Sequence, residues 1–307
     1  MKNAKYRSRS VLIELAFGLY VCTSIGCSGG SAELTEGDGG MPPQLAVGAA
    51  LLVDVSWVDE RIDSTDVQIV DVRTSSEFDA AHIPGALSLS QADLRATVDG
   101  VGGQVAPPAT VQEVFRSAGI RNDTTIVVYS SGIDTAAARV VWTLGYHQHG
   151  DVRLLDGGFG AWERAALPLS QETPPVASSD YVVGNLDESL IVDADWIFDR
   201  LPASPNTDPD LVLVDARSQG EFDAGHIPSA QSVEWTRNLS EGAMRPVAEV
   251  RTLYPNVEET NTFVAYCASG SRASVAWFVM RWLGYADARL YDGSWNEWGS
   301  RDLPVER

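Results

Sequence analysis

The sequence predicts an α/β protein made of two copies of one domain unit, each a mainly parallel β-sheet flanked by helices. Three observations predict this architecture. The length of 307 residues suits two domains of ordinary size. A set of motifs occurs twice in the same order, and short apolar runs alternate with segments of helical periodicity. A hydrophobic content of 44% supports packed cores and excludes a chain that is disordered throughout.

The chain opens with a segment that has the pattern of an export signal. Four cations within the first nine residues precede a mostly apolar run over residues 11–26, and this run is shorter than the roughly 20 residues that span a bilayer. Residues 24–27 (Ser-Ile-Gly-Cys) resemble the lipobox of bacterial lipoproteins, in which the cysteine is acylated. We expect a signal and lipobox over 1–27, a lipid on Cys27, and a flexible polar tether over 28–45. The protein would then be exported and anchored in the cell envelope. A plain secretory signal, giving a periplasmic or secreted protein, is the alternative.

An internal duplication covers nearly all of the remaining chain. Three motifs recur at offsets of 144, 139 and 136 residues, so the copies share one fold and differ in loop length. We expect a first domain over 46–170, a linker over 171–185 that begins with a Pro- and Ser-rich stretch, and a second domain over 186–307. The paired segments are 70–86 with 214–230, 51–57 with 190–196, and the Asp-Gly-Gly of 156–158 with the Asp-Gly-Ser of 292–294.

Apolar runs predict the strands of each copy, and one clear helical pattern lies between two of them. Residues 271–283 place Ala276, Val279, Met280 and Leu283 on one face of a helix. Strand–helix–strand alternation implies parallel pairing, and such sheets bind ligands beyond the carboxyl ends of their strands. The predicted strands are 68–72, 125–129 and 153–155 in the first copy, and 211–214, 262–266 and 289–291 in the second.

Cys267 is the residue that points most directly to chemistry. It follows the predicted strand 262–266 and precedes the predicted helix, so the thiol lies at a helix N-terminus. Backbone N–H groups and the helix dipole favour an anion there, which favours the nucleophilic thiolate. A thiol that only fills the core is the alternative. The turn after Cys267 consists of small residues and ends in a cation: Ala268, Ser269, Gly270, Ser271 and Arg272.

Together these motifs resemble the tandem-domain rhodanese family of sulfurtransferases, over residues 46–307. The resemblance rests on the Asp-X-Arg and His-Ile-Pro segments of both copies, the Cys-X-X-Gly-X-Arg loop that begins at Cys267, and the Asp-Gly-Gly/Ser motifs. It implies that Cys267 takes a sulfane sulfur from a donor, holds it as a persulfide, and passes it to a thiophilic acceptor such as cyanide or a thiol. The loop 268–272 would stabilise the persulfide anion.

The resemblance also implies that the two copies differ in activity. Ser130 stands in the first copy where the second has Cys267, and a serine hydroxyl has no route to a persulfide. Asp134 adds an acid where an anion-binding loop would want none. We therefore expect only the second copy to be catalytic, with the first supporting it.

Three further residues receive roles through the resemblance. The Asp-X-Arg arginine of the second copy, which contacts substrate in the family, is Arg217 here; a structural ion pair near Glu221 is the alternative. Asp71 and His82 match residues to which a relay with a loop serine, here Ser269, has been assigned in 3-mercaptopyruvate sulfurtransferases. A structural role in the turn after His82 is the alternative for this pair.

The identity of the donor depends on the end of the loop. The mercaptopyruvate enzymes typically have Val-Thr where this chain has Ser271-Arg272, and a cation at that place suits a dianion such as thiosulfate. We therefore expect thiosulfate as the donor, with 3-mercaptopyruvate as the alternative. A persulfide carrier or binding module without turnover is a second alternative. Cys-based phosphatases of a related fold have a loop one residue longer, which disfavours phosphate as the substrate.

Composition excludes several other classes of function. A net charge of −20 argues against binding to nucleic acid. Three cysteines are too few for a disulfide scaffold or a Cys-only zinc site, and the four histidines lack the spacing of metal ligands. We expect no cofactor and no metal, a monomer, a small anionic sulfur donor with a thiol or cyanide acceptor, and membrane contact only through a lipid on Cys27.

Overall fold

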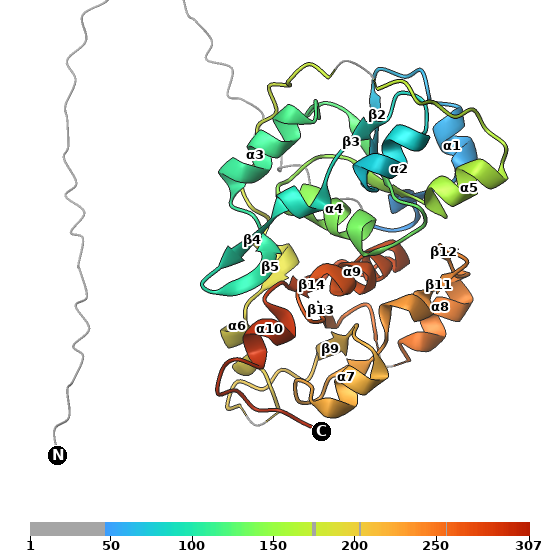
Figure 1. The fold of residues 1–307 in the computed structure, drawn as a ribbon. Helices are drawn as coiled ribbons and strands as arrows, with labels where there is room; N and C mark the ends of the chain where they lie inside the picture. Colours follow the sequence, from blue (N-terminus) through green and yellow to red (C-terminus); the bar gives the residue numbers. More distant parts are fainter. Residues whose placement is uncertain (1–46, 174–175, 203, 256) are drawn as a thin grey trace, which may run out of the picture. The chain divides into compact units, whose positions relative to one another are not determined.

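Each half of the chain forms one five-stranded sheet in which all neighbouring strands are parallel. The protein is seen in a computed structural model that describes residues 47–307 except 174–175, 203 and 256. The predicted signal, Cys27 and the tether therefore lie outside the described residues. The strand order is β1-β7-β6-β2-β3 in the first half and β10-β9-β13-β14-β8 in the second. Helices flank both sheets (Figure 1), which confirms the predicted α/β fold.

The elements follow one another in the same order in both halves. The first sheet contains β1 (Leu52–Val53), β2 (Val67–Asp71), β3 (Leu87–Ser88), β6 (Thr125–Tyr129) and β7 (Val152–Leu155). The second contains β8 (Ile191–Val192), β9 (Leu211–Asp215), β10 (Gln231–Ser232), β13 (Thr262–Tyr266) and β14 (Ala288–Tyr291). The α-helices are α1 (Val55–Asp59), α2 (Ser75–Ala80), α3 (Pro108–Ser117), α4 (Thr135–Tyr146), α5 (Gly158–Arg164), α6 (Ala194–Phe198), α7 (Gln219–Ala224), α8 (Val247–Leu253), α9 (Ser271–Leu283) and α10 (Ser294–Trp298).

Helices α2 and α7 begin in the same way because the duplicated motif carries its own cap. Thr74 and Glu77 form a capping box at the start of α2, and Ser218 and Glu221 form the matching one at the start of α7. In each box the hydroxyl and the carboxylate satisfy backbone N–H groups that the helix leaves unpaired. The turn after the Asp-X-Arg motif is therefore held rigidly in both halves.

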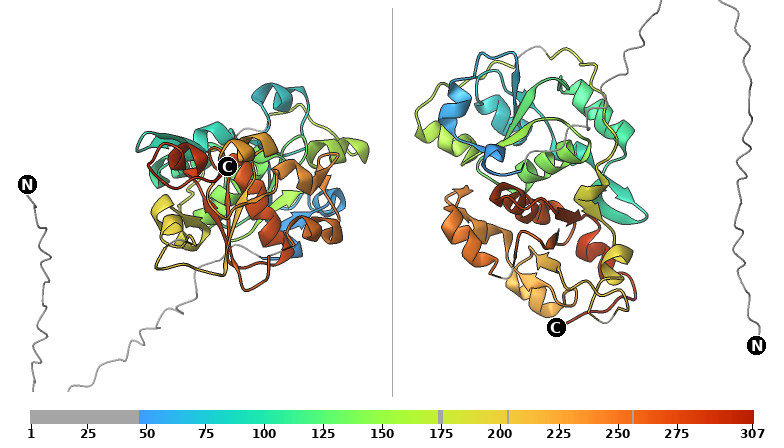
Figure 2. Two further views of the ribbon diagram at one scale, coloured as in Figure 1. Left: turned by 90° about the horizontal axis from the view of Figure 1, so that it is seen from below. Right: turned by 180° about the vertical axis from the view of Figure 1, so that it is seen from behind.

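Helix α9 spans the predicted residues but is buried on nearly all sides, not on one face. It packs against β13 and β14 of its own sheet and also against α4 of the first half. Figures 1 and 2 show α4 and α9 lying against each other between the two sheets. The largest hydrophobic cluster draws residues from both halves, so the halves share a core. None of the described helices is long and apolar enough to cross a membrane.

Each half also extends a two-stranded antiparallel hairpin toward the other. Strands β4 (Arg95–Val98) and β5 (Val101–Val105) form the hairpin of the first half, and β11 (Leu239–Ser240) and β12 (Ala243–Met244) form that of the second. Strand β5 contacts α10 of the second half. Part of the predicted linker packs on the first half, because Tyr181 is buried there against Phe115. The exact limits of the two domains stay a prediction.

Candidate active site

The loop that carries Cys267 connects the end of β13 to the start of α9. Cys267 is buried, with 1% of its surface exposed. Gly270 adopts a left-handed conformation, with φ of 82°. A Cβ atom at Gly270 would overlap Asp292 Oδ1 and lie 2.7 Å from Arg139 Nη1. Glycine is required here both for the turn and for this close approach.

The N-terminus of α9 has no side-chain cap, whereas Asp134 caps the N-terminus of α4 in the first half. Gly270 has no side chain that could accept from the first N–H groups of α9. Asp134 at the matching place accepts from the N–H groups of Ala136 and Ala137, and also from Ser130 Oγ at 2.5 Å. The first half thus has its own carboxylate at the helix N-terminus, whereas the second half has no side-chain acceptor there.

The Ser294 hydroxyl forms hydrogen bonds with the backbone of the Cys267 loop. Its Oγ accepts from the N–H groups of Cys267 and Gly270, both at 3.1 Å, and donates to the carbonyl of Tyr291 at 2.8 Å. Ser294 has a φ of 52°, in the left-handed region that favours glycine, and the first half has Gly158 at this place. Sequence reasoning aligned these two residues but missed the contacts of the Ser294 hydroxyl with the loop.

Arg272, the cation that the sequence assigns to the donor, is paired with a carboxylate in this structure. Its Nη1 and Nη2 atoms donate to the two carboxylate oxygens of Glu221, at 2.7 and 2.8 Å. The hydrogen bond from Arg272 lowers the pKa of Glu221 to about 2. The pKa of Arg272 is raised, chiefly by Glu221, and Cys267 acts in the same direction. Most of the Arg272 charge is therefore offset beside the thiol.

Two arginines of the first half reach the loop, and sequence reasoning missed both. Arg95 Nη2, from β4, donates to Ser269 Oγ at 3.2 Å and to the Ser269 carbonyl at 3.4 Å. Arg139, from α4, is fully buried and pairs with Asp292 at 2.5 Å. One signal was present in the sequence, because Arg139 is a lone cation within an otherwise apolar helical segment.

Arg217 forms a buried ion pair in this structure, so its contact with substrate stays a prediction. Its Nε and Nη2 atoms donate to the Asp215 carboxylate, and Nη2 also donates to the Gly225 carbonyl at 2.7 Å. The residue is only 3% exposed. Arg73 of the first half makes the same contacts with Asp71. Because the half without a cysteine has this arrangement too, the pair serves the fold. The ion-pair partner of Arg217 is Asp215, whereas the structural alternative placed the pair near Glu221.

Asp71 and His82 have partners other than Ser269, as the structural interpretation of this pair expects. His82 stacks on Phe78 with ring centroids 3.8 Å apart, and its two ring nitrogens contact the carbonyls of Phe78 and Glu172. Asp71 accepts from the Tyr129 hydroxyl at 2.6 Å as well as from Arg73. Both side chains therefore hold the turn of the duplicated motif, which is the structural alternative.

Comparison with known proteins places this fold and loop in a family. The family described as "Rhodanese-like domain" matches residues 54–165 and 199–301. The chain belongs to the rhodanese family. It is 31% identical to the sulfur carrier protein TtuD of Thermus thermophilus, over 81% of this chain and 94% of that protein. It is 32% identical to a thiosulfate sulfurtransferase of Corynebacterium glutamicum, over 83% of this chain and 90% of that one.

Relatives named for a different sulfur donor have similar sequence identity to this chain. A 3-mercaptopyruvate sulfurtransferase of Escherichia coli is 28% identical, over 83% of this chain and 97% of that protein. The crystal structure of SseA from Escherichia coli, described as a rhodanese fold, superposes with a TM-score of 0.72 at 25% identity, covering 80% of this chain and 98% of that one. Tandem rhodanese domains are therefore shared with proteins named for either donor.

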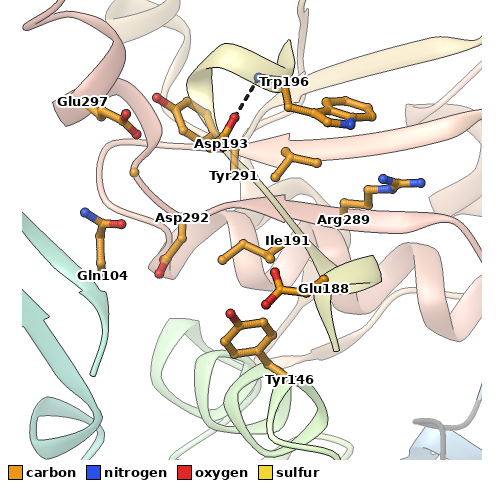
Figure 3. A pocket seen from close by; sticks show the side chains of 12 residues that line it. Gln104, Tyr146, Glu188, Ile191, Asp193, Trp196, Arg289, Tyr291, Asp292 and Glu297 are labelled. Carbon is orange, nitrogen blue, oxygen red and sulfur yellow. Dashed lines mark hydrogen bonds between the residues drawn. The ribbon is translucent and has the colours of Figure 1, made fainter. Parts of the chain in front are cut away.

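A cavity of about 380 Å³ is lined in part by Asp292. Figure 3 shows that side chains from both halves line it, including Tyr146 of α4 and Glu188 of the second half. Its carboxylates are Glu188, Asp193, Asp292 and Glu297. Cys267 is not among its lining residues, and its negative charge disfavours an anionic donor. Within the described ranges, no group of three His, Cys, Asp or Glu side chains is placed to hold a metal ion.

Proposed function

We propose that this rhodanese is a sulfurtransferase that moves the outer sulfur of thiosulfate through Cys267 to a thiophilic acceptor. The observation that carries the proposal is the contrast between the two loops. The second half places a thiol at an uncapped helix N-terminus, whereas Asp134 fills the matching place beside Ser130. Relatives named as sulfurtransferases support the reaction class.

The reaction follows from the position of the thiolate. The Cys267 thiolate attacks the outer sulfur of thiosulfate, a new S–S bond forms, and the S–S bond within thiosulfate breaks. Its electron pair leaves with sulfite, and a Cys267 persulfide anion remains. Cyanide or a thiolate then attacks the outer sulfur of the persulfide and restores the Cys267 thiolate. The uncapped N–H groups of α9 stabilise the negative charge at each stage.

Thiocyanate release from thiosulfate and cyanide tests this reaction. We expect the wild type to turn over and Cys267→Ser to lose essentially all activity. Ser130→Ala, at the matching place in the first half, is the control and should keep wild-type rates. Turnover by Cys267→Ser would contradict the proposal. Rates with 3-mercaptopyruvate above those with thiosulfate would contradict the choice of donor, and a Cys267 persulfide that forms without turnover would favour the carrier alternative.

We also propose that the chain is exported and anchored in the cell envelope by a lipid on Cys27. The charged start, the short apolar run and the lipobox-like residues 24–27 support this. The full-length protein should partition into the detergent phase of a Triton X-114 extract, and Cys27→Ala should move it to the aqueous phase. Equal partitioning of both forms would contradict the anchor. The monomer that we propose should elute from size exclusion at the mass of one chain.

A further inference from the structure

Arg139 is a fully buried cation whose guanidinium group is only partly satisfied. Its Nη1 atom donates to Asp292 Oδ1 at 2.5 Å. Its Nε and Nη2 atoms have no hydrogen-bond partner within the described part of the chain, although the side chain is 0% exposed. Buried N–H donors without an acceptor are costly. This group therefore suits a ligand that brings acceptor oxygens.

Arg95 adds a second cation beside the same loop. Its contacts with Ser269, at 3.2 and 3.4 Å, are long for hydrogen bonds, so an anionic acceptor can replace them at low cost. Burial lowers the pKa of Arg95 and the nearby Arg139 adds to this, whereas Asp292 and Cys267 oppose it. Arg95 contacts Ser269 and Arg139 closely approaches Gly270, so both guanidinium groups lie at the loop that carries Cys267.

Apart from the Cys267 thiolate itself, the charged groups around the loop leave one positive charge. Asp292 offsets Arg139, and Glu221 offsets Arg272, but Arg95 makes no ion pair within the described residues. In a chain whose net charge is −20, this local surplus is where an anion would be attracted. The cavity lined by Asp292 has the opposite charge, because its other carboxylates are Glu188, Asp193 and Glu297.

We propose that Arg95 and Arg139 form the binding site for the oxyanion end of a dianionic sulfur donor. The inference rests on the proposed function, because it assumes that Cys267 attacks the outer sulfur of that donor. Arg95 exchanges Ser269 for a sulfonate oxygen, and the unpartnered nitrogens of Arg139 supply further donors. The forked geometry of guanidinium groups suits such an oxyanion. The half without a nucleophile would thereby determine which donor the other half uses.

Sulfate, an unreactive dianion, probes this site without turnover. We expect sulfate to slow the alkylation of Cys267 by iodoacetamide, and Arg95→Gln to require about ten times more sulfate for the same protection. The KM for thiosulfate should rise about tenfold in this variant, while discharge of preformed persulfide by cyanide keeps its rate. Arg153→Gln is the matched control, because Arg153 is half-buried but pairs with Asp151 in the first half. It should behave as the wild type.

The second variant is Arg139→Gln combined with Asp292→Asn, which removes both members of the buried pair so that neither charge is left alone. It should also weaken sulfate protection. Unchanged protection and unchanged KM in Arg95→Gln would overturn the site. A wild type that turns over thiosulfate without any protection by sulfate would overturn it too, while leaving the proposed function intact. Protection that depends on Arg95 in a protein that releases no thiocyanate would support the anion site and reject the proposed function.

Discussion

The backbone N–H of Val105 in the first half donates to Asp292 Oδ2 in the second half at 2.7 Å. The reverse contact also exists, because the N–H of Met244 donates to Asp156 Oδ1 at 2.8 Å. Asp156 and Asp292 are the acids of the duplicated Asp-Gly-Gly/Ser motif. In each half, the acid of this motif therefore accepts a hydrogen bond from the hairpin of the other half. Of these two acids, only Asp292 also pairs with a buried arginine. The two acids therefore make matching hydrogen bonds to the hairpins but differ in their ion pairs.

This difference predicts unequal effects of removing the two acids. Asp292→Ala leaves Arg139 buried without its partner and should lower the free energy of unfolding by about 3–5 kcal/mol. Asp156→Ala removes an acceptor for Met244 and should cost about 1–3 kcal/mol. Urea denaturation of both variants measures the difference. Equal losses would contradict the assignment of Arg139 to Asp292.

Ser294 should act as a positioning residue for Cys267. Ser294→Gly keeps a residue that accepts a φ of 52° and removes only the hydroxyl that holds the N–H groups of Cys267 and Gly270. We expect the rate of persulfide formation to fall about tenfold, with a smaller change in KM. Single-turnover kinetics with thiosulfate measure this step. A normal rate in Ser294→Gly would show that two backbone contacts of α10 suffice, in which the N–H groups of Trp295 and Asn296 donate to the carbonyls of Cys267 and Ala268.

The ion pair of Arg272 with Glu221 predicts an acid-sensitive contribution to stability. The pKa of Glu221 falls from 4.5 to about 2 on folding, so the contribution is complete above about 4.5 and disappears as the pH falls toward 2. Glu221 is 40% exposed, and solvent screening limits the pair to less than about 1 kcal/mol. The difference in unfolding free energy between wild type and Glu221→Gln should shrink across this window. A constant difference from pH 6 to pH 2 would contradict the pair.

Arg217 and Arg73 should respond alike to substitution. Arg217→Ala and Arg73→Ala each leave a buried aspartate unpaired and should each cost about 3–5 kcal/mol of stability. At a temperature where Arg217→Ala remains folded, the KM for thiosulfate should stay near the wild-type value. A rise in KM confined to the Arg217 variant would instead support its predicted contact with substrate.

Much of the framework could be predicted because it depends on local patterns. Strands 125–129 and 262–266 and helix 271–283 have the predicted limits, since apolar runs and helical periodicity define them. Predicted strand 68–72 is shifted by one residue, to Val67–Asp71. The burial of α9 on nearly all sides was not predictable, because it depends on α4 from the other half.

The charged groups of the site were harder to predict, because ion pairs form between residues distant in sequence. Arg217 lies near both Asp215 and Glu221 along the chain, so the sequence does not decide which of them is its partner. In the fold, Arg217 pairs with Asp215 and Arg272 pairs with Glu221. Arg95 reaches Ser269 through a hairpin of the other half, and its sequence carries no sign of this contact. The loop itself was predictable, because its residues are contiguous.

Intact-protein mass spectrometry after incubation with thiosulfate tests whether Cys267 carries the transferred sulfur. We expect the protein to gain the mass of one sulfur atom, peptide mapping to place it on Cys267, and cyanide to remove it with release of one equivalent of thiocyanate. A protein that gains no sulfur, or gains it at a residue other than Cys267, would show that Cys267 is not the sulfur carrier.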